Sequence, residues 1–208
     1  MGTFSFRKAA DMADAGHLVP HAIRWIIEAG NPYYDVLFGD ASSTLTNLQK
    51  WACRGTSEVS IRRVEFLMSD SEFAGGFIAL SGGDLRKARR ADSIALLTSV
   101  APQCRSALTL RLTNVSDLMT PVGDDEYYLS KLGLAHQFRG KRLARTLVDR
   151  YIEEGVRLGY SGCRLDVHAD NEAAIRCYCS AGFEICNRTE SKDGALKYYS
   201  MKYVRVGA

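Results

Sequence analysis

A short basic turn at the start of a helix is the first candidate for chemistry. After an apolar run from Tyr128 to Leu134, the polar segment 136–141 reads HQFRGK, and an apolar pattern of helical period opens at Leu143. The first amides of a helix have no partner within it, and the helix dipole at that end favours negative charge. With a glycine that allows close approach and flanking cations, the turn predicts a site for a pyrophosphate. The residues of this cradle are Arg139, Gly140, Lys141, Arg142, Leu143 and Ala144.

The spacing in this turn excludes two common phosphate-binding motifs. The P-loop spacing G-x-x-x-x-G-K-[ST] is absent, and so is the dinucleotide fingerprint G-x-G-x-x-G. The ligand predicted here is therefore a phosphorylated cofactor that is held in another way.

A second pattern, N-x-x-A-x-x-x-Y-x-x-x-G-F, follows a predicted strand at 163–168. Ala174 and Tyr178 are four residues apart, so they share one face of a helix, and the small side chain leaves room beside the phenol. The pattern consists of Asn171, Ala174, Tyr178, Gly182 and Phe183.

Together the two patterns resemble those of the GNAT superfamily, N-acetyltransferases that move an acetyl group from acetyl-CoA to an amine. The segment 137–142 is similar to the family's cofactor signature, [RQ]-x-x-G-x-[GA], and the pattern around Tyr178 is similar to its next motif. The two stand in the family's order within Tyr127 to Phe183, whereas the resemblance becomes thin before Val64. It implies an acyl-CoA-dependent N-acyltransferase with acetyl-CoA as co-substrate.

One position in the turn departs from the family's pattern. Arg142 stands where the family usually has a small residue, and Ala144 keeps the next small position. An arginine fits a helical backbone at this point, but it would not fit a backbone that needs positive φ. The resemblance further implies that β-strand backbone pairs with the pantetheine arm and that Asn171 both caps its helix and contacts the cofactor. The implied contacts outside the turn are Leu132, Gly133, Leu134, Asn171, Ala174 and Tyr178.

Acetyl transfer to an amine requires two groups that handle protons. The amine must lose a proton before it attacks the thioester, and the thiolate that leaves benefits from gaining one. By resemblance the acid is Tyr178, although packing of a core tyrosine on Phe183 would also explain it. For the base, the candidates are Asp166, on the strand where some family members place a carboxylate, Glu126 at the start of the preceding strand, and a chain of water molecules. A surface or salt-bridged role is an equal alternative for each carboxylate.

The acceptor site is implied by resemblance alone. In the family, the two helices after the first strand and the loop between them border this site. Tyr33, Tyr34 and Asp35 lie in the corresponding turn and would line it. Packing of both tyrosines at a corner, with their hydroxyls in water, is the alternative.

The resemblance implies a GNAT-like α/β fold with a mixed, mostly antiparallel central sheet flanked by helices, and a separation between the fourth and fifth strands where CoA enters. Apolar alternation and helical periodicity indicate the elements, and Asp11 or Asp14 is expected to cap the first helix. The chain 1–208 is expected to form one domain. Strands are predicted at 4–9, 64–68, 73–80, 128–134, 163–168, 184–189 and 197–204, and helices at 17–29, 43–53, 143–158 and 171–181.

The segment from about 82 to 121 is a helical insertion between the third and fourth strands. Two helices are predicted in it, at 84–100 and 103–119. The basic cluster 86–90 on the first helix is interpreted as a solvated face. The insertion either shapes the acceptor pocket or forms a surface for a homodimer.

Composition narrows the class of partner. The chain has 208 residues, 46% of them hydrophobic, and its 27 basic and 24 acidic residues leave a net charge of only +3. This balance argues against nucleic acid or an anionic membrane as the main partner and favours a small-molecule or peptide amine. No apolar run approaches the roughly 20 residues needed to span a bilayer. Six cysteines without a framework spacing predict reduced thiols, a cytoplasmic protein and no metal site.

Two functions follow from these observations. The first is direct transfer of acetyl from acetyl-CoA to a primary amine of a small molecule or peptide. The second is a CoA-binding regulatory or structural protein without turnover, which Arg142 and the open identity of the base leave in consideration.

Overall fold

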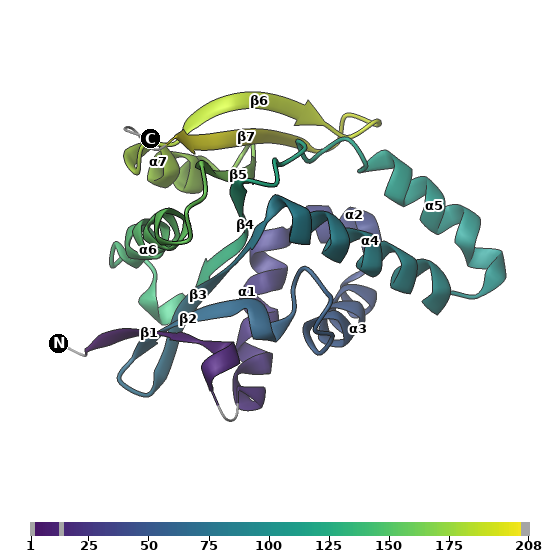
Figure 1. The fold of residues 1–208 in the computed structure, drawn as a ribbon. Coiled ribbons are helices and arrows are strands. Elements are labelled where there is room, and N and C mark those ends of the chain that lie inside the picture. Colours follow the sequence, from purple (N-terminus) through teal and green to yellow (C-terminus); the bar gives the residue numbers. More distant parts are fainter. Residues whose placement is uncertain (1–2, 13–14, 205–208) are drawn as a thin grey trace.

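The computed structural model describes residues 3–12 and 15–204 and is built on one seven-stranded sheet (Figure 1). The strand order is β1-β2-β3-β4-β5-β7-β6. Neighbouring strands are antiparallel except for β4 and β5, which are parallel. The sheet is thus mixed and mostly antiparallel, as the sequence predicts. Its strands are β1 (Phe4–Lys8), β2 (Val64–Ser69), β3 (Glu72–Ser81), β4 (Glu126–Leu134), β5 (Gly162–His168), β6 (Glu184–Glu190) and β7 (Lys197–Val204).

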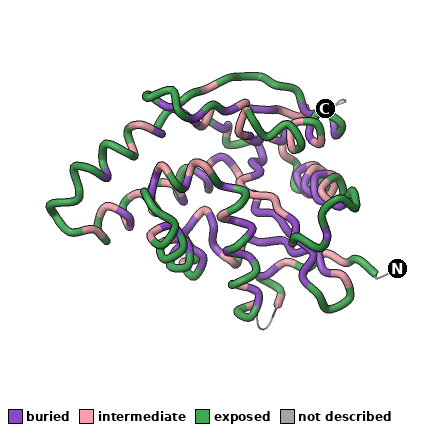
Figure 2. The backbone as a smooth tube through the Cα atoms, turned by 180° about the vertical axis from the view of Figure 1, so that it is seen from behind, coloured by how far each residue is buried: buried purple, intermediate pink, exposed green. Residues whose placement is uncertain are grey.

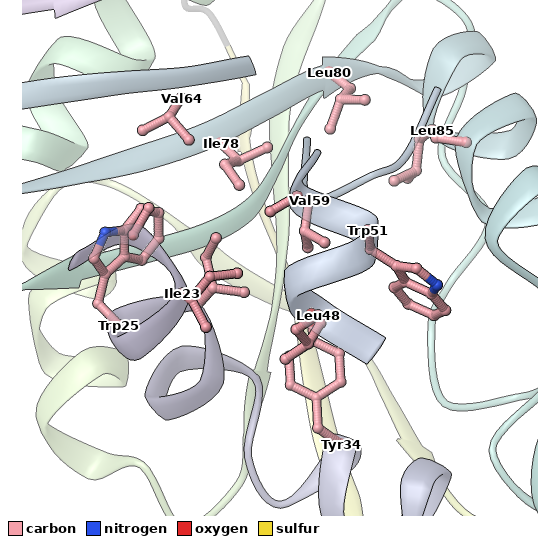
Figure 3. Close-up of a cluster of buried hydrophobic side chains, with 14 of the residues drawn as sticks. Ile23, Trp25, Tyr34, Leu48, Trp51, Val59, Val64, Ile78, Leu80 and Leu85 are labelled. Carbon is pink, nitrogen blue, oxygen red and sulfur yellow. The ribbon is translucent and has the colours of Figure 1, made fainter. Parts of the chain in front are cut away.

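Helices cover both faces of the sheet (Figure 1). One face carries α1 (Val19–Gly30), α2 (Tyr33–Phe38) and α3 (Ala41–Ala52), and the other carries α6 (Leu143–Arg157) and α7 (Glu172–Ser180). Successive strand residues point to opposite faces, so Phe66 and Met68 enter the core of the first layer while Leu67 enters that of the second. Figure 3 shows the first core, where Ile23 of α1 and Leu48 of α3 gather beside the sheet.

The start of α1 was predicted to be capped by Asp11 or Asp14. Among the described residues no side chain caps its N-terminus, and Pro20 occupies the first turn. Asp11 ends a short 3-10 helix at Ala9–Asp11, and Asp14 lies outside the described residues. Within 3–12 and 15–204, no helix combines the length and the apolar character needed to cross a membrane.

The insertion between β3 and β4 forms a helical hairpin that projects beyond the sheet (Figures 1 and 2). It contains α4 (Gly82–Ser99) and α5 (Arg105–Asn114). α5 ends five residues before the predicted boundary because Asn114 is held by the turn between β6 and β7: Lys192 N donates to its carbonyl at 3.0 Å and Asp193 N to its side chain at 3.0 Å. Beyond that point Val115 and Leu118 turn inward and are buried.

β4 and β5 pair over four residues and then separate. Their ladder runs from Glu126 opposite Gly162 to Leu129 opposite Leu165, although β4 continues to Leu134 and β5 to His168. At the same point β4 carries an extra residue, Ser130, relative to β3. Such a bulge bends a strand and increases its twist. The predicted separation between the fourth and fifth strands is therefore present.

A buried tyrosine of α6 joins the two strands just before they separate. The Tyr151 hydroxyl lies 2.5 Å from the Tyr127 carbonyl of β4, and it accepts a hydrogen bond of 3.1 Å from the Arg164 amide of β5. The whole side chain is buried. One hydroxyl thus satisfies backbone groups on both strands.

We predict that Tyr151→Phe lowers the free energy of unfolding by about 1–3 kcal/mol, because buried backbone groups lose their partner. Urea denaturation measures the loss. The matched control is Tyr160→Phe, since the ring of half-buried Tyr160 stacks on Tyr127 with centroids 4.9 Å apart, and we expect a change within about 0.5 kcal/mol. Equal losses in both variants would show that the hydroxyl of Tyr151 contributes nothing special.

Candidate active site

Two cavities meet where β4 and β5 separate. The first, of about 460 Å³, lies among β4, β5, α1, α7 and the start of α6. The second, of about 400 Å³, lies among β4, α2, α3, α4 and the segment around α5. Both are lined by Ser130, Lys131, Asp166 and Tyr198. The separation of the strands therefore forms a passage between the two faces of the sheet.

The structure brings most of the predicted cofactor residues to the first cavity. Three predicted residues contribute differently: Leu143 is buried in the core, Lys141 places its ammonium 5.1 Å from the centre of the Phe138 ring, and Arg142 is exposed in the turn. Those that line the cavity are Leu132, Gly133, Leu134, Arg139, Gly140, Ala144, Asn171, Ala174 and Tyr178.

The backbone of β4 forms one wall of this cavity. From Lys131 to Leu134 the strand pairs with β3 on one side, while its ladder with β5 has already ended at Leu129. The backbone edge that faces the cavity is thus free for a ligand that adds as a strand would. Gly133 allows α1 to cover this wall, since a Cβ there would lie 3.0 Å from the side chain of Trp25.

The turn before α6 is open and has an unusual backbone. Gly140 has φ +75°, and a Cβ built on it would meet nothing within 4 Å. Arg142 has φ +61° and ψ +9°, so it lies in the left-handed region rather than in the helical one. The expectation that an arginine would not fit a positive φ is therefore wrong, because the residue adopts this conformation at a cost of about 1–2 kcal/mol. Arg139 is fixed across the cavity mouth, where its Nε donates to the Leu134 carbonyl at 3.3 Å and its guanidinium pairs with Glu28 of α1.

Tyr178 lies on the α7 side of the first cavity. Its ring is 9% exposed and packs edge-to-face on Phe183 with centroids 6.0 Å apart. Burial raises the pKa of Tyr178 well above its ordinary value. The phenol therefore keeps its proton at neutral pH, the form that a proton donor requires. The helix start is fixed by Asn171, whose side chain accepts from Ala174 N at 3.1 Å.

Asp166 of β5 faces both cavities. It accepts hydrogen bonds from the Tyr128 hydroxyl, at 2.9 Å, and from the Ser200 hydroxyl. Burial raises the pKa of Asp166, and these two hydrogen bonds and the nearby arginines oppose the rise only in part. A carboxylate with a raised pKa is a stronger base than an ordinary aspartate.

Glu126 lies at the other end of β4 and lines neither cavity. It is 7% exposed, accepts from Gly123 N at 2.9 Å, and pairs with Lys202 at 2.8 Å and with Arg164 at 3.6 Å. Although burial raises the pKa of Glu126, these partners lower it overall. The structure does not bring the Glu126 carboxylate to the site. Its ion pairs with Lys202 and Arg164 explain why a carboxylate is buried at this position.

Comparison with known proteins agrees with this geometry. Residues 109–183 match the model of the acetyltransferase (GNAT) family. This segment, which contains the patterns around Gly140 and Tyr178, is therefore similar to the GNAT acetyltransferases. Members of this family are acyl-CoA-dependent N-acetyltransferases. A search of curated proteins finds no significant match.

Solved structures show the same fold at low sequence identity. An N-acetyltransferase from Staphylococcus aureus Mu50 is 17% identical, with a TM-score of 0.69 over 96% of this chain and 100% of that one. The ribosomal-protein-S18-alanine N-acetyltransferase from Escherichia coli is 16% identical, with a TM-score of 0.55 over 99% and 96%. The NatC complex, solved with a Gag peptide and CoA, is 12% identical, with a TM-score of 0.54 over 98% and 99%.

The predicted acceptor residues of this protein divide between the second cavity and solvent. Tyr33 and Tyr34 line the second cavity, on the short helix α2 rather than on a turn. Asp35, the next residue of that helix, is exposed and lines neither cavity. The structure therefore brings two of the three residues to this site.

Four charged residues of the second cavity were missed by sequence reasoning: Glu58, Arg89, Asp92 and Lys131. Arg89 belongs to the basic cluster that was interpreted as a solvated face, and that interpretation is wrong for this residue. Its Nε donates to Glu58 at 3.0 Å, and its side chain is 31% exposed. A signal was present, because Arg89 shares one helix face with Leu85, Asp92 and Leu96, all three of them buried.

These charges form one hydrogen-bonded network that reaches Asp166. Glu58 also accepts from the Ser130 hydroxyl at 2.5 Å. Burial raises the pKa of Glu58, but the charges of Arg89 and Lys131 outweigh burial and lower it to about 2. Arg89 donates to the Tyr128 oxygen at 3.1 Å. Since an arginine can only donate, the single proton of Tyr128 is directed to Asp166.

No arrangement typical of a metal centre accompanies this network. In the part of the chain that the structure describes, His, Cys, Asp and Glu side chains form no group of three or more that could hold a metal ion. The first cavity is instead lined by the phenol of Tyr178 and the carboxylate of Asp166.

The backbone conformation of the turn before α6 can be tested by substituting Gly140. We predict that Gly140→Ala lowers the free energy of unfolding by about 1 kcal/mol, because alanine is disfavoured at this positive φ while its methyl group meets no other atom. Gly55→Ala is the control, since that glycine also has open space around its Cβ but no positive φ. Urea denaturation should show no loss for Gly55→Ala, and equal effects in the two variants would contradict the assigned backbone conformation.

Proposed function

We propose that this protein transfers an acetyl group from acetyl-CoA directly to a primary amine of a small molecule or peptide. The observation that carries the proposal is that Tyr178 and Asp166, a protonated phenol and a carboxylate of raised pKa, line the same cavity at the separation of β4 and β5. An acid and a base are the two groups that acetyl transfer to an amine needs.

The chemistry of the residues that line the first cavity supports acetyl-CoA as the co-substrate. The turn around Gly140 is open, and Lys141 and Arg142 add positive charge beside the first amides of α6, which suits a diphosphate. The free edge of β4 at Leu132–Leu134 suits the amides of a pantetheine arm. Asn171 and Ala174 border the opposite side.

In the reaction, acetyl-CoA supplies the activated acetyl group as a thioester. Asp166 accepts a proton from the acceptor amine, either directly or through a water molecule. Tyr178 donates its proton to the sulfur as the carbon–sulfur bond breaks. Tyr128 and Ser200 hold the Asp166 carboxylate in place through their hydroxyl groups.

We predict that Tyr178→Phe lowers kcat by about 10²–10⁴-fold, the usual contribution of a general acid, and leaves CoA affinity nearly unchanged. Thiol release measures turnover and calorimetry measures CoA binding. Tyr199→Phe is the control, because Tyr199 lines neither cavity. Unchanged turnover in Tyr178→Phe would remove this residue from the mechanism. CoA binding without thiol release, for any amine in a broad panel, would favour a regulatory protein without turnover.

We predict that kcat/KM falls at acid pH through the titration of Asp166. The base form is lost as the pH drops through the pKa of this carboxyl, which burial raises above the ordinary value of about 3.9. The acid limb should therefore lie at higher pH than that of an ordinary aspartate. With one amine as substrate throughout, Asp166→Asn should remove this limb and Glu126→Gln should leave it in place. Loss of the limb in Glu126→Gln instead would identify the other carboxylate as the base.

A further inference from the structure

The second cavity has two chemically different parts. Where it joins the first cavity its lining is polar, with Ser130, Lys131 and Asp166. The residues that line the second cavity alone include a large apolar group from α2, α3, α4 and the segment around α5. This apolar group consists of Leu37, Trp51, Leu96, Leu112, Val115 and Met119.

Lys131 lies where the two cavities join, and its ammonium group can donate a further hydrogen bond to a ligand. Its side chain is 13% exposed, and its Nζ donates to the Ser130 carbonyl at 3.0 Å, makes a long hydrogen bond of 3.5 Å to the Ser130 hydroxyl oxygen, and lies 5.4 Å from the centre of the Tyr34 ring. Glu58 is 4.0 Å away, and its carboxylate is already held by Arg89 and by the hydroxyl of Ser130. An ammonium has three donors. A ligand that brings an anionic oxygen to Lys131 would therefore complete its hydrogen bonds.

Asp92, the other carboxylate of this wall, offers little to a cationic ligand. Its Oδ2 accepts from the Ser57 hydroxyl and from Glu58 N, each at 2.9 Å. Its Oδ1 is shielded from solvent and finds no hydrogen-bond partner among the described residues, with Arg54 3.9 Å away. The second ammonium of a polyamine would thus enter an apolar space whose nearby carboxylates, Glu58 and Asp92, are already held by protein donors, which is unfavourable.

We propose that the acceptor is a small amino acid with an aliphatic or aromatic side chain, whose carboxylate binds at Lys131 and whose side chain lies in the apolar part of the second cavity. The inference rests on the proposed function, because it takes Asp166 as the base beside the acceptor amine. A cavity of about 400 Å³ is in the range of small-molecule sites. The projecting hairpin of α4 and α5 supplies much of its apolar wall.

The transfer balances without a further reactant. The amine nitrogen forms a bond to the acetyl carbon, and the bond from that carbon to sulfur breaks. Asp166 takes the proton of the amine, Tyr178 gives its proton to the sulfur, and solvent returns a proton from Asp166 to Tyr178. The products are an N-acetyl amino acid and CoA.

The first test compares three acceptors of known chemistry with acetyl-CoA in a thiol-release assay. Phenylalanine carries both the carboxylate and the apolar side chain, phenethylamine lacks the carboxylate, and spermidine is a polycation. We expect kcat/KM for phenylalanine to exceed that of each of the others by about tenfold or more, the scale of discrimination that one well-matched group provides. In Lys131→Met the ratio of phenylalanine to phenethylamine should fall toward one. Preference for spermidine, or an unchanged ratio in this variant, would overturn the inference.

The second test probes the apolar part with a matched pair of variants on one helix. Leu112→Glu places a charge in the cavity, whereas Leu110→Glu changes a side chain that is 73% exposed and outside it. We expect Leu112→Glu to raise KM for phenylalanine about tenfold or more and Leu110→Glu to leave it unchanged. Equal KM values in the two variants would overturn the inference.

Calorimetry of phenylalanine binding to the CoA-loaded protein separates this inference from the proposed function. Binding without turnover would support the assigned pocket and contradict the transferase. Turnover of spermidine without phenylalanine binding would support the transferase and contradict the pocket. If phenylalanine neither binds nor is acetylated, the inference is wrong.

Discussion

The site depends on the early end of the ladder between β4 and β5. Four residue pairs hold the strands together, and the bulge at Ser130 then turns β4 away from its neighbour. Tyr151 satisfies backbone groups of both strands just before this point. Because a sheet interior normally pairs all its backbone groups, an unpaired edge inside a fold is a position where a ligand can complete the pairing. Both cavities, and the residues that they share, exist because of this separation.

Charges in the second cavity are kept ionised by one another. Removing an ion from water costs several kcal/mol, and a partly buried charge is tolerated only when hydrogen bonds and opposite charges offset that cost. Glu58 has Arg89, Lys131 and Ser130 around it, and Arg89 continues the contacts to Tyr128 and so to Asp166. Within residues 3–12 and 15–204, Asp166 makes no ion pair, and the burial that raises its pKa is only partly offset by the more distant Arg89 and Arg164. One network thus holds one carboxylate charged and leaves another poised to take a proton.

The fold shared with the solved structures and the proposed acceptor site draw on different parts of the chain. The solved structures that share the fold are less than 20% identical to this protein, so they establish the architecture and not the acceptor. The insertion contributes Arg89, Leu96 and Leu112 to the second cavity. An insertion in this position can alter the acceptor without disturbing the parts of the fold that bind a cofactor.

The sequence by itself determined the features that neighbouring residues encode. Helical period after Leu143, alternation along β5 and the spacing from Asn171 to Tyr178 predicted the elements and the order in which they bring the cofactor residues together, because these signals arise between residues a few positions apart. The mostly antiparallel sheet, the separated strands and the inserted helices follow the expectation drawn from the family resemblance. Even so, periodicity placed the end of α5 five residues too late, since the turn that stops it lies about 80 residues further along the chain.

Only the tertiary structure decided which charged groups reach the site. Arg89 and Glu58 are 31 residues apart, and nothing local to either predicts their pairing. Asp166 and Glu126 were equal candidates in the sequence, but β4 runs its full length between Glu126 and the separated edge, which leaves Glu126 among the cations at the far end. The sequence likewise left the backbone conformation at Arg142 undecided, and the structure shows that it is left-handed. Local chemistry fixes what each segment can do, whereas the position of a charge relative to a cavity is set by contacts between segments far apart in the chain.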